Sequence, residues 1–273
     1  LASMLDFRNR NMGGHVVTVE DPIEFVHTHN RCIIDQREVG LDTHSFQDAL
    51  RHVLRQSPDV IMIGEIRDAE TMRHVLHYAE TGHLCISTLH SNNANQAIDR
   101  IISFFPESAH RQVRMDLSLN LRGVIAQRLV DGKAGGRVLA SEVMVWSAYI
   151  SELIQKGEID EIKGAIAKSG TVGMHTFDQS LYELFQQGAI TLPQALEHAA
   201  HRLVVTAHIM FGMGHFRAGR GSDAGRLGEL RQLPQGPVVQ QFAQRVRPVR
   251  RSLHGPRTAP ASAGPAAVPH PLR

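Results

Sequence analysis

The sequence predicts an α/β fold, in which a mostly parallel sheet is flanked by helices and followed by a helical subdomain. Over residues 15–105, short apolar runs alternate with longer amphipathic stretches, a pattern typical of parallel strands joined by crossover helices. From about residue 107 the pattern becomes mainly helical, with glycines between the helical stretches. The length of 273 residues and the apolar share of 42% fit one or two ordinary globular domains.

Five runs are predicted to be strands. HVVTVE (15–20), DVIMIG (59–64) and HLCISTL (83–89) are short and apolar, so we expect three buried strands. Residues 32–35 and 137–145 are the other two candidates. If the first three strands are parallel, their carboxyl ends lie at one edge of the sheet.

Eight stretches have apolar residues at helical spacing. The clearest is 45–56, which Ser45 is expected to cap and the Ser57-Pro58 pair to end. We also expect the end of a helix over 1–10, and helices over 68–80, 95–105, 148–154, 159–167, 176–187 and 192–200.

The charge of the chain changes near residue 200. Residues 201–273 hold eleven arginines, two acidic residues and eight of the twelve prolines, a net charge of +9, whereas residues 1–200 carry −7. Such a composition buries too little apolar surface to offset chain entropy, so we expect a disordered tail. Residues 203–213 argue against this, because they could pack as a final helix. The predicted organisation is a core over 1–130, a helical subdomain over 131–200 and a tail over 201–273.

Side chains suited to phosphate chemistry follow the three buried strands. Glu65 ends an apolar strand in the manner of a Walker B segment, whose carboxylate can hold a hydrated Mg²⁺ or orient a water. Glu20 and Asp21 follow the first strand, and Pro22 turns the chain there. His90 ends the third strand, where an imidazole can donate to a phosphate oxygen. We expect these side chains at one edge, although a solvated loop or a structural histidine is the plainer interpretation of each motif alone.

Two further candidates are open to more than one interpretation. Arg67 either contacts phosphate or pairs with an acid. His83, Cys85 and His90 could form a metal site, but His90 does not share the strand face of the other two and no fourth ligand is evident. The sequence also contains no G-x-x-x-x-G-K-[ST] loop. Without its backbone amides and lysine, a site holds triphosphate poorly.

Several long segments together resemble one family, the PilT/PilU-type twitching-motility ATPases of the type II/type IV secretion ATPase superfamily. They are TVEDPIEF, RQSPDVIMIGEIRDAET, AETGHLCISTLHSNNANQAIDRIISFFP and GMHTFDQSLYELFQQG. The resemblance runs from residue 1 to about 200, and the segment SLNLRGVIAQRLV is closer to PilU-type than to PilT-type sequences. It implies a RecA-like P-loop NTPase core that retracts type IV pili with ATP and Mg²⁺.

The resemblance also implies partners and a location. The family works as a hexamer, so we expect a homo-hexamer or a mixed ring with a paralogous retraction ATPase. That ring would act on an inner-membrane platform protein, with no specific nucleic acid. The expected location is cytoplasmic, peripheral at the inner-membrane face. The sequence agrees, because it has no apolar run that could span a bilayer and only two cysteines, Cys32 and Cys85.

Site roles follow from the same resemblance. Glu20 would polarise the attacking water and Glu65 would act on Mg²⁺ through water, although the two roles could be exchanged. The residues expected to contact the nucleotide or its phosphates are Asp21, Arg67, His83 and His90. Residues 148–154 lie where retraction ATPases carry a helical motif needed for retraction. Residues 1–4 resemble those that follow the family's Gly-Lys-Ser/Thr loop, so we expect this chain to start just after that loop, to lack the PAS-like domain and to be inactive alone.

Two other functions remain open. One is a non-enzymatic ring or assembly subunit whose ring partners supply catalysis. The other is nucleic-acid binding through the tail, centred on Arg245, Arg247, Arg250 and Arg251, although no aromatic residues lie between these arginines for base stacking. A third interpretation of the tail is an out-of-frame translation of GC-rich DNA.

Overall fold

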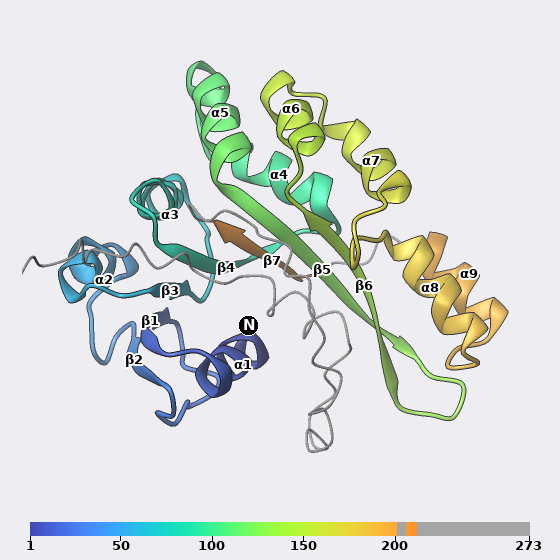
Figure 1. The fold of residues 1–273 in the computed structure, drawn as a ribbon, viewed down its shortest axis with the longest axis horizontal. Helices are drawn as coiled ribbons and strands as arrows, with labels where there is room; N and C mark the ends of the chain where they lie inside the picture. Colours follow the sequence, from blue (N-terminus) through green and yellow to red (C-terminus); the bar gives the residue numbers. More distant parts are fainter. Residues whose placement is uncertain (201–205, 212–273) are drawn as a thin grey trace, which may run out of the picture.

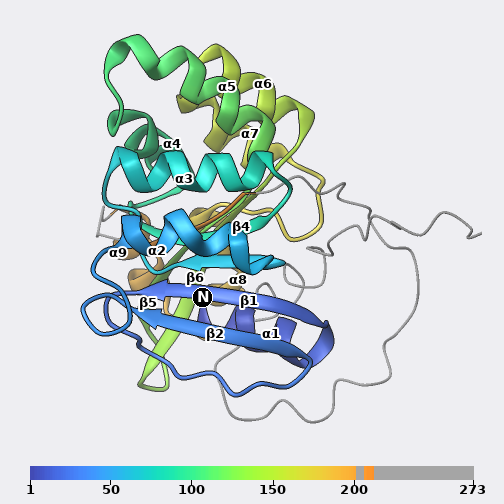
Figure 2. The same cartoon turned by 90° about the vertical axis from the view of Figure 1, so that its left-hand side faces the viewer.

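The structure is a computed structural model that describes residues 1–200 and 206–211. A seven-stranded sheet, in the order β2-β1-β3-β4-β7-β5-β6, forms its core, and helices flank it (Figure 1). Figures 1 and 2 both show α2 and α3 above strand β1, and α1 below it. The predicted α/β class is confirmed.

The four strands that position the candidate site are parallel. They are β1 (Gly14–Glu20), β2 (Cys32–Glu38), β3 (Val60–Ile63) and β4 (Leu84–His90). Val19 pairs with Ile63, and Ile63 with Ser87, so the residues after these positions end side by side. All four strands were predicted, and the expected common carboxyl edge is confirmed.

Several of the described helices, among them α2, α3, α4, α6 and α8, begin at a capping side chain that the sequence supplies. Ser45 accepts a hydrogen bond from the backbone N–H of Asp48, as predicted, and Asp68 caps α3 by accepting one from Thr71. The helices are α1 (Ala2–Asn11), α2 (Phe46–Val53), α3 (Ala69–Glu80), α4 (Ala94–Ser103), α5 (His110–Asn120), α6 (Ala148–Lys156), α7 (Ile162–Lys168), α8 (Phe177–Gln186) and α9 (Leu192–Ala200).

The other half of the sheet is antiparallel and only partly predicted. β5 (Leu121–Asp131) pairs with β6 (Arg137–Val145), which was expected, but β5 itself lies where a mainly helical pattern was predicted. Its run of buried residues contains β-branched Val124 and Ile125, which suit a strand covered on both faces. Since β6 belongs to this sheet, residues 131–200 contribute a strand as well as helices.

The last strand corrects the prediction for residues 203–213. β7 (Thr206–Phe211) is not a helix but a strand, and it lies antiparallel between β4 and β5. There its backbone satisfies hydrogen-bonding groups on both neighbours, and Ile209, Met210 and Phe211 are buried. The expectation that no ordered structure follows residue 200 is therefore wrong for these six residues. The expectations for 201–205 and 212–273 lie outside the described residues.

Candidate active site at the carboxyl edge of the sheet

The turn after β3 is bonded to both neighbouring strands. The N–H of Gly64 donates to the carbonyl of Val19 at 2.8 Å, and that of Ile66 donates to the carbonyl of Thr88 at 3.1 Å. The Thr88 hydroxyl donates back to the Gly64 carbonyl at 2.6 Å. A Cβ at Gly64 would lie 3.4 Å from the Cα of Glu20, so the two backbones approach closely. This bonding places the residues that follow β1 and β3 next to each other.

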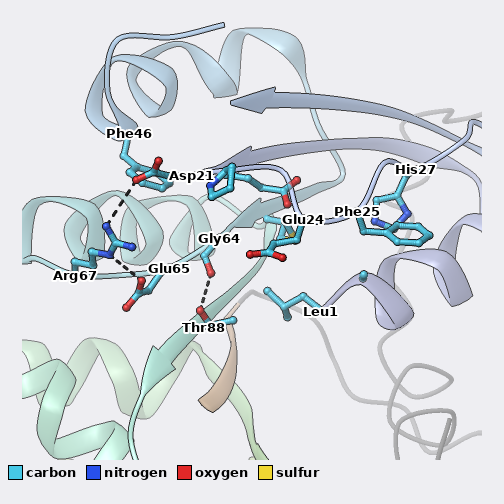
Figure 3. Close-up of a pocket in the computed structure, with 14 residues that line it drawn as sticks. Leu1, Asp21, Glu24, Phe25, His27, Phe46, Gly64, Glu65, Arg67 and Thr88 are labelled. Atoms are coloured by element: carbon cyan, nitrogen blue, oxygen red, sulfur yellow. Dashed lines mark hydrogen bonds and ion pairs between the residues drawn. The ribbon is translucent and has the colours of Figure 1, made fainter. Parts of the chain in front are cut away.

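A cleft of about 420 Å³ opens at this edge. Figure 3 shows Asp21, Glu65 and Arg67 at one end of it, and Phe25, His27 and Leu1 at the other. Its lining residues are Leu1, Ala2, Glu20, Asp21, Pro22, Glu24, Phe25, His27, Phe46, Met62, Gly64, Glu65, Arg67 and Thr88. The cleft therefore has an acidic end and a largely apolar end.

Glu20 is buried and held in one orientation. Its side chain is 8% exposed. The Thr18 hydroxyl donates to Glu20 Oε1 at 2.6 Å, and Gln36 Nε2 donates to the same oxygen at 3.1 Å. Two donors on one oxygen fix the carboxylate against rotation, which is what a group that orients a water requires.

Glu65 is contacted on both carboxylate oxygens. Arg67 Nε donates to Oε2 at 2.7 Å, and His90 Nε2 lies 3.1 Å from Oε1. Arg67 Nη1 also lies 3.7 Å from Asp21 Oδ2. Residues that follow or end β1, β3 and β4 thus form one network of polar contacts, called here the strand-end network: Asp21, Glu65, Arg67 and His90.

Burial and charge shift the pKa of two groups at the cleft. The hydrogen bond to Glu65 raises the pKa of the Arg67 guanidinium. Burial lowers the pKa of His27, against the attraction of Glu20. Arg67 therefore stays charged, whereas His27 is shifted towards its neutral form.

The structure brings together most of the predicted site residues. Glu20, Asp21, Glu65 and Arg67 line the cleft, and His90 joins them through Glu65. His83 is apart from them, because it precedes β4 and so lies at the opposite end of that strand from His90. There its Nδ1 lies 3.0 Å from the Thr81 hydroxyl, within hydrogen-bonding distance.

Sequence reasoning missed several contributors to the cleft. Thr88 sits two residues before His90, so the period of a strand could have pointed to it. Gln36 lies on β2 beside Thr18, and only the strand register brings it to Glu20. Leu1 and Ala2, at the start of the sequence, also line the cleft.

The donor set fits a nucleotide with a hydrated cation only in part. Carboxylates at the acidic end suit hydrated Mg²⁺. Arg67 is the only arginine or lysine among the described lining residues, and it is already paired. Within residues 1–200 and 206–211, no three histidine, cysteine or acidic side chains are placed to hold a metal directly. His83 and His90 lie at opposite ends of β4, so the structure does not bring His83, Cys85 and His90 together as one site.

Residues 1–197 match the family model that is described as "Type II/IV secretion system protein". The chain belongs to this family. It is 56% identical over 202 residues to the type IV pilus ATPase PilU of Pseudomonas aeruginosa. The aligned region covers 73% of this chain and 52% of PilU. It is 44% identical over 199 residues to the retraction ATPase PilT of the same organism, over 73% of this chain and 58% of PilT.

Solved structures agree with the family assignment. The structure described as the pilus retraction motor PilT with bound ADP superposes with a TM-score of 0.68 at 46% identity, covering 73% of this chain and 57% of that one. The ATPase DotB of Legionella pneumophila superposes with a TM-score of 0.62 at 28% identity, covering 70% of this chain and 52% of that one. The RecA-like α/β fold is therefore confirmed. The chain spans a little over half the length of PilU and of PilT.

None of the described helices of this family member is long and apolar enough to cross a membrane.

Proposed function

We propose that this chain is part of the ATP-hydrolysing domain of a type IV pilus retraction motor. The observation that carries the proposal is the meeting of Glu20, Asp21, Glu65 and His90 at one sheet edge, beside the start of α1. Its relatives are named as pilus ATPases, and one of their structures is described with bound ADP.

In this proposal each acidic residue has a distinct task. Bound Mg²⁺ would neutralise the phosphate charge that develops during transfer. Glu65, whose carboxylate lines the cleft, would hold that ion through water. Glu20 would orient the attacking water, because its carboxylate is buried and fixed by Thr18 and Gln36. Asp21 and His90 remain candidates for contact with the nucleotide phosphates, whereas His83 lies at the other end of β4.

The assembly is also a proposal. We infer a ring of six copies, or a mixed ring with a paralogous retraction ATPase, that works on an inner-membrane platform protein from the cytoplasmic face. The match to PilU and PilT over 73% of the chain supports this inference. The C-terminal helical motif at 148–154 falls on α6, whose Tyr149 is 56% exposed and so accessible to a partner.

One observation favours a second candidate, a non-enzymatic ring or assembly subunit. Arg67, the single arginine or lysine among the described residues that line the cleft, is already paired with Glu65. In that case a neighbouring subunit would supply the catalytic groups, and this chain would contribute binding surfaces.

ATP hydrolysis by a fusion separates the two candidates. A G-x-x-x-x-G-K-[ST] segment from a family member is joined ahead of Leu1, and phosphate release is measured with Mg²⁺ and ATP. The enzyme proposal expects Mg²⁺-dependent turnover that Glu65→Gln abolishes. Binding of ATP without turnover would favour the assembly subunit. DNA binding that falls steeply with salt and disappears when residues 201–273 are deleted would favour a nucleic-acid function.

A further inference from the structure

The charge of Arg67 decides how the cleft meets an anionic ligand. Among the described residues that line the cleft, it is the sole arginine or lysine, alongside the carboxylates of Glu20, Asp21, Glu24 and Glu65. Its guanidinium can serve the ligand or these carboxylates. The distances show which partner it has.

Both contacts of Arg67 are with carboxylates. Its Nε donates to Glu65 Oε2 at 2.7 Å, the length of a charge-assisted hydrogen bond. Its Nη1 lies 3.7 Å from Asp21 Oδ2, which is an electrostatic contact beyond hydrogen-bond distance. Figure 3 shows the guanidinium between the two acidic side chains. The Arg67 guanidinium therefore links Asp21, which follows β1, to Glu65, which follows β3.

The burial of the two partners differs in a way that favours this pairing. The side chain of Glu65 is 17% exposed, whereas that of Arg67 is 61% exposed. A largely buried carboxylate that loses its cation is left with an uncompensated negative charge, which is energetically unfavourable. An exposed guanidinium, in contrast, is readily hydrated. Moving Arg67 to a phosphate would therefore be unfavourable for Glu65, and the neighbouring acids would add repulsion.

We propose that Arg67 is a positioning residue, which orients the Glu65 carboxylate, holds Asp21 beside it and does not bind the nucleotide phosphates. This differs from the expectation that Arg67 contacts phosphate. The catalytic part of the inference rests on the proposed nucleotide site, whereas the pairing of Arg67 with the carboxylates does not.

The first experiment uses this chain as it is, with Mn²⁺ alone as the probe, followed by its electron paramagnetic resonance signal. If Arg67 neutralises Glu65 and Asp21, Arg67→Gln removes a competing cation, and the chain binds Mn²⁺ at least about threefold more tightly. The double variant Glu65→Gln/Arg67→Gln loses this gain. An affinity for Mn²⁺ that is the same in Arg67→Gln and in the original chain would overturn the proposal.

Arg10→Gln is the matched control for this experiment. Arg10 is also exposed, at 51%, and its Nε also donates to a carboxylate, that of Asp6 at 3.1 Å. It does not line the cleft. The same chemical change should therefore leave Mn²⁺ binding unchanged, and a gain equal to that of Arg67→Gln would show a general charge effect and contradict the proposal.

The second experiment separates positioning from phosphate binding in the fusion that carries a phosphate loop ahead of Leu1. We expect Arg67→Gln to keep the ATP dissociation constant within about threefold and to lose at least about tenfold in kcat. Arg67→Lys should recover only part of kcat, because an ammonium lacks the fixed Nε–H fork. ATP binding that weakens about tenfold with kcat preserved would show a phosphate ligand instead.

Failure of the proposed function is distinguishable from failure of this inference. If the unsubstituted fusion binds no ATP, the nucleotide site is wrong. The Mn²⁺ comparison then still decides whether Arg67 is committed to Glu65 and Asp21.

Discussion

His90 Nε2 lies 3.1 Å from Glu65 Oε1, so the last residue of β4 contacts the carboxylate that follows β3. The two residues are far apart in the sequence, and the parallel pairing of β3 with β4 brings them together. Through Glu65, His90 is connected to Arg67 and Asp21 in the strand-end network. A substitution at the end of β1, β3 or β4 is therefore expected to affect the side chains at the other two strand ends.

The purified chain alone should show no ATP hydrolysis above background. It has no phosphate loop in its sequence, and the cation that lines its cleft is paired with Glu65. Phosphate release with Mg²⁺ and ATP, compared with the Glu65→Gln variant, is the measurement. Mg²⁺-dependent turnover that vanishes in Glu65→Gln would show the prediction to be wrong.

In the fusion that carries a phosphate loop, Glu20→Ala should lower turnover more than about tenfold while ATP still binds. A group that orients water acts mainly on the transition state, so ground-state binding changes little. Turnover and ATP affinity are measured together. Glu24→Gln is the control, since Glu24 lines the same cleft but is exposed. Retention of a tenth or more of the turnover in Glu20→Ala would remove Glu20 from this role.

Glu142 should make stability depend on pH. It is 3% exposed on β6, and it accepts hydrogen bonds from the backbone N–H groups that begin α4 and α8, those of Ala94 and Phe177. Burial raises its pKa despite these bonds. Between the ordinary pKa of a glutamate and this raised value, the folded state binds more protons than the unfolded state. The free energy of unfolding therefore falls as pH rises through that window.

The glutamine in Glu142→Gln does not titrate, so the free energy of unfolding of this variant does not fall for this reason as pH rises. Its free energy of unfolding, relative to that of the original chain, should increase from about pH 4.5 towards pH 7. Urea unfolding at several pH values gives the comparison. Glu152→Gln is the control, because Glu152 is 54% exposed. A difference for Glu142→Gln that stays constant or falls with pH would contradict the prediction.

Strand β7 should be required for the stability of the described fold. Phe211 is fully buried between β4 and β5, so Phe211→Ala is expected to cost about 3–5 kcal/mol of unfolding free energy. Leu129→Ala on β5 is the control, since Leu129 is 56% exposed and its loss should change stability by less than about 0.5 kcal/mol. Equal effects in urea unfolding would indicate that β7 is not part of the folded core.

The sequence alone determined the class of the fold and the edge at which the candidate site lies. Short buried runs that alternate with amphipathic stretches allow few arrangements other than a parallel sheet. Because β1, β3 and β4 are parallel neighbours, Glu20, Glu65 and His90 lie at the same edge of the sheet. Local pattern was enough for these features.

Only the tertiary structure decided which partners these residues have. Whether Arg67 faces a phosphate or Glu65 depends on where its neighbours lie in space, and Gln36 reaches Glu20 only through the register of β1 and β2. The same holds for β5 and β7, whose short apolar runs fit a helix or a strand equally well. They became strands because they pair with each other and with β4 or β6, and backbone groups buried there need partners. Periodicity records which side of an element is buried, but hydrogen-bond partners from distant elements leave no local pattern in the sequence.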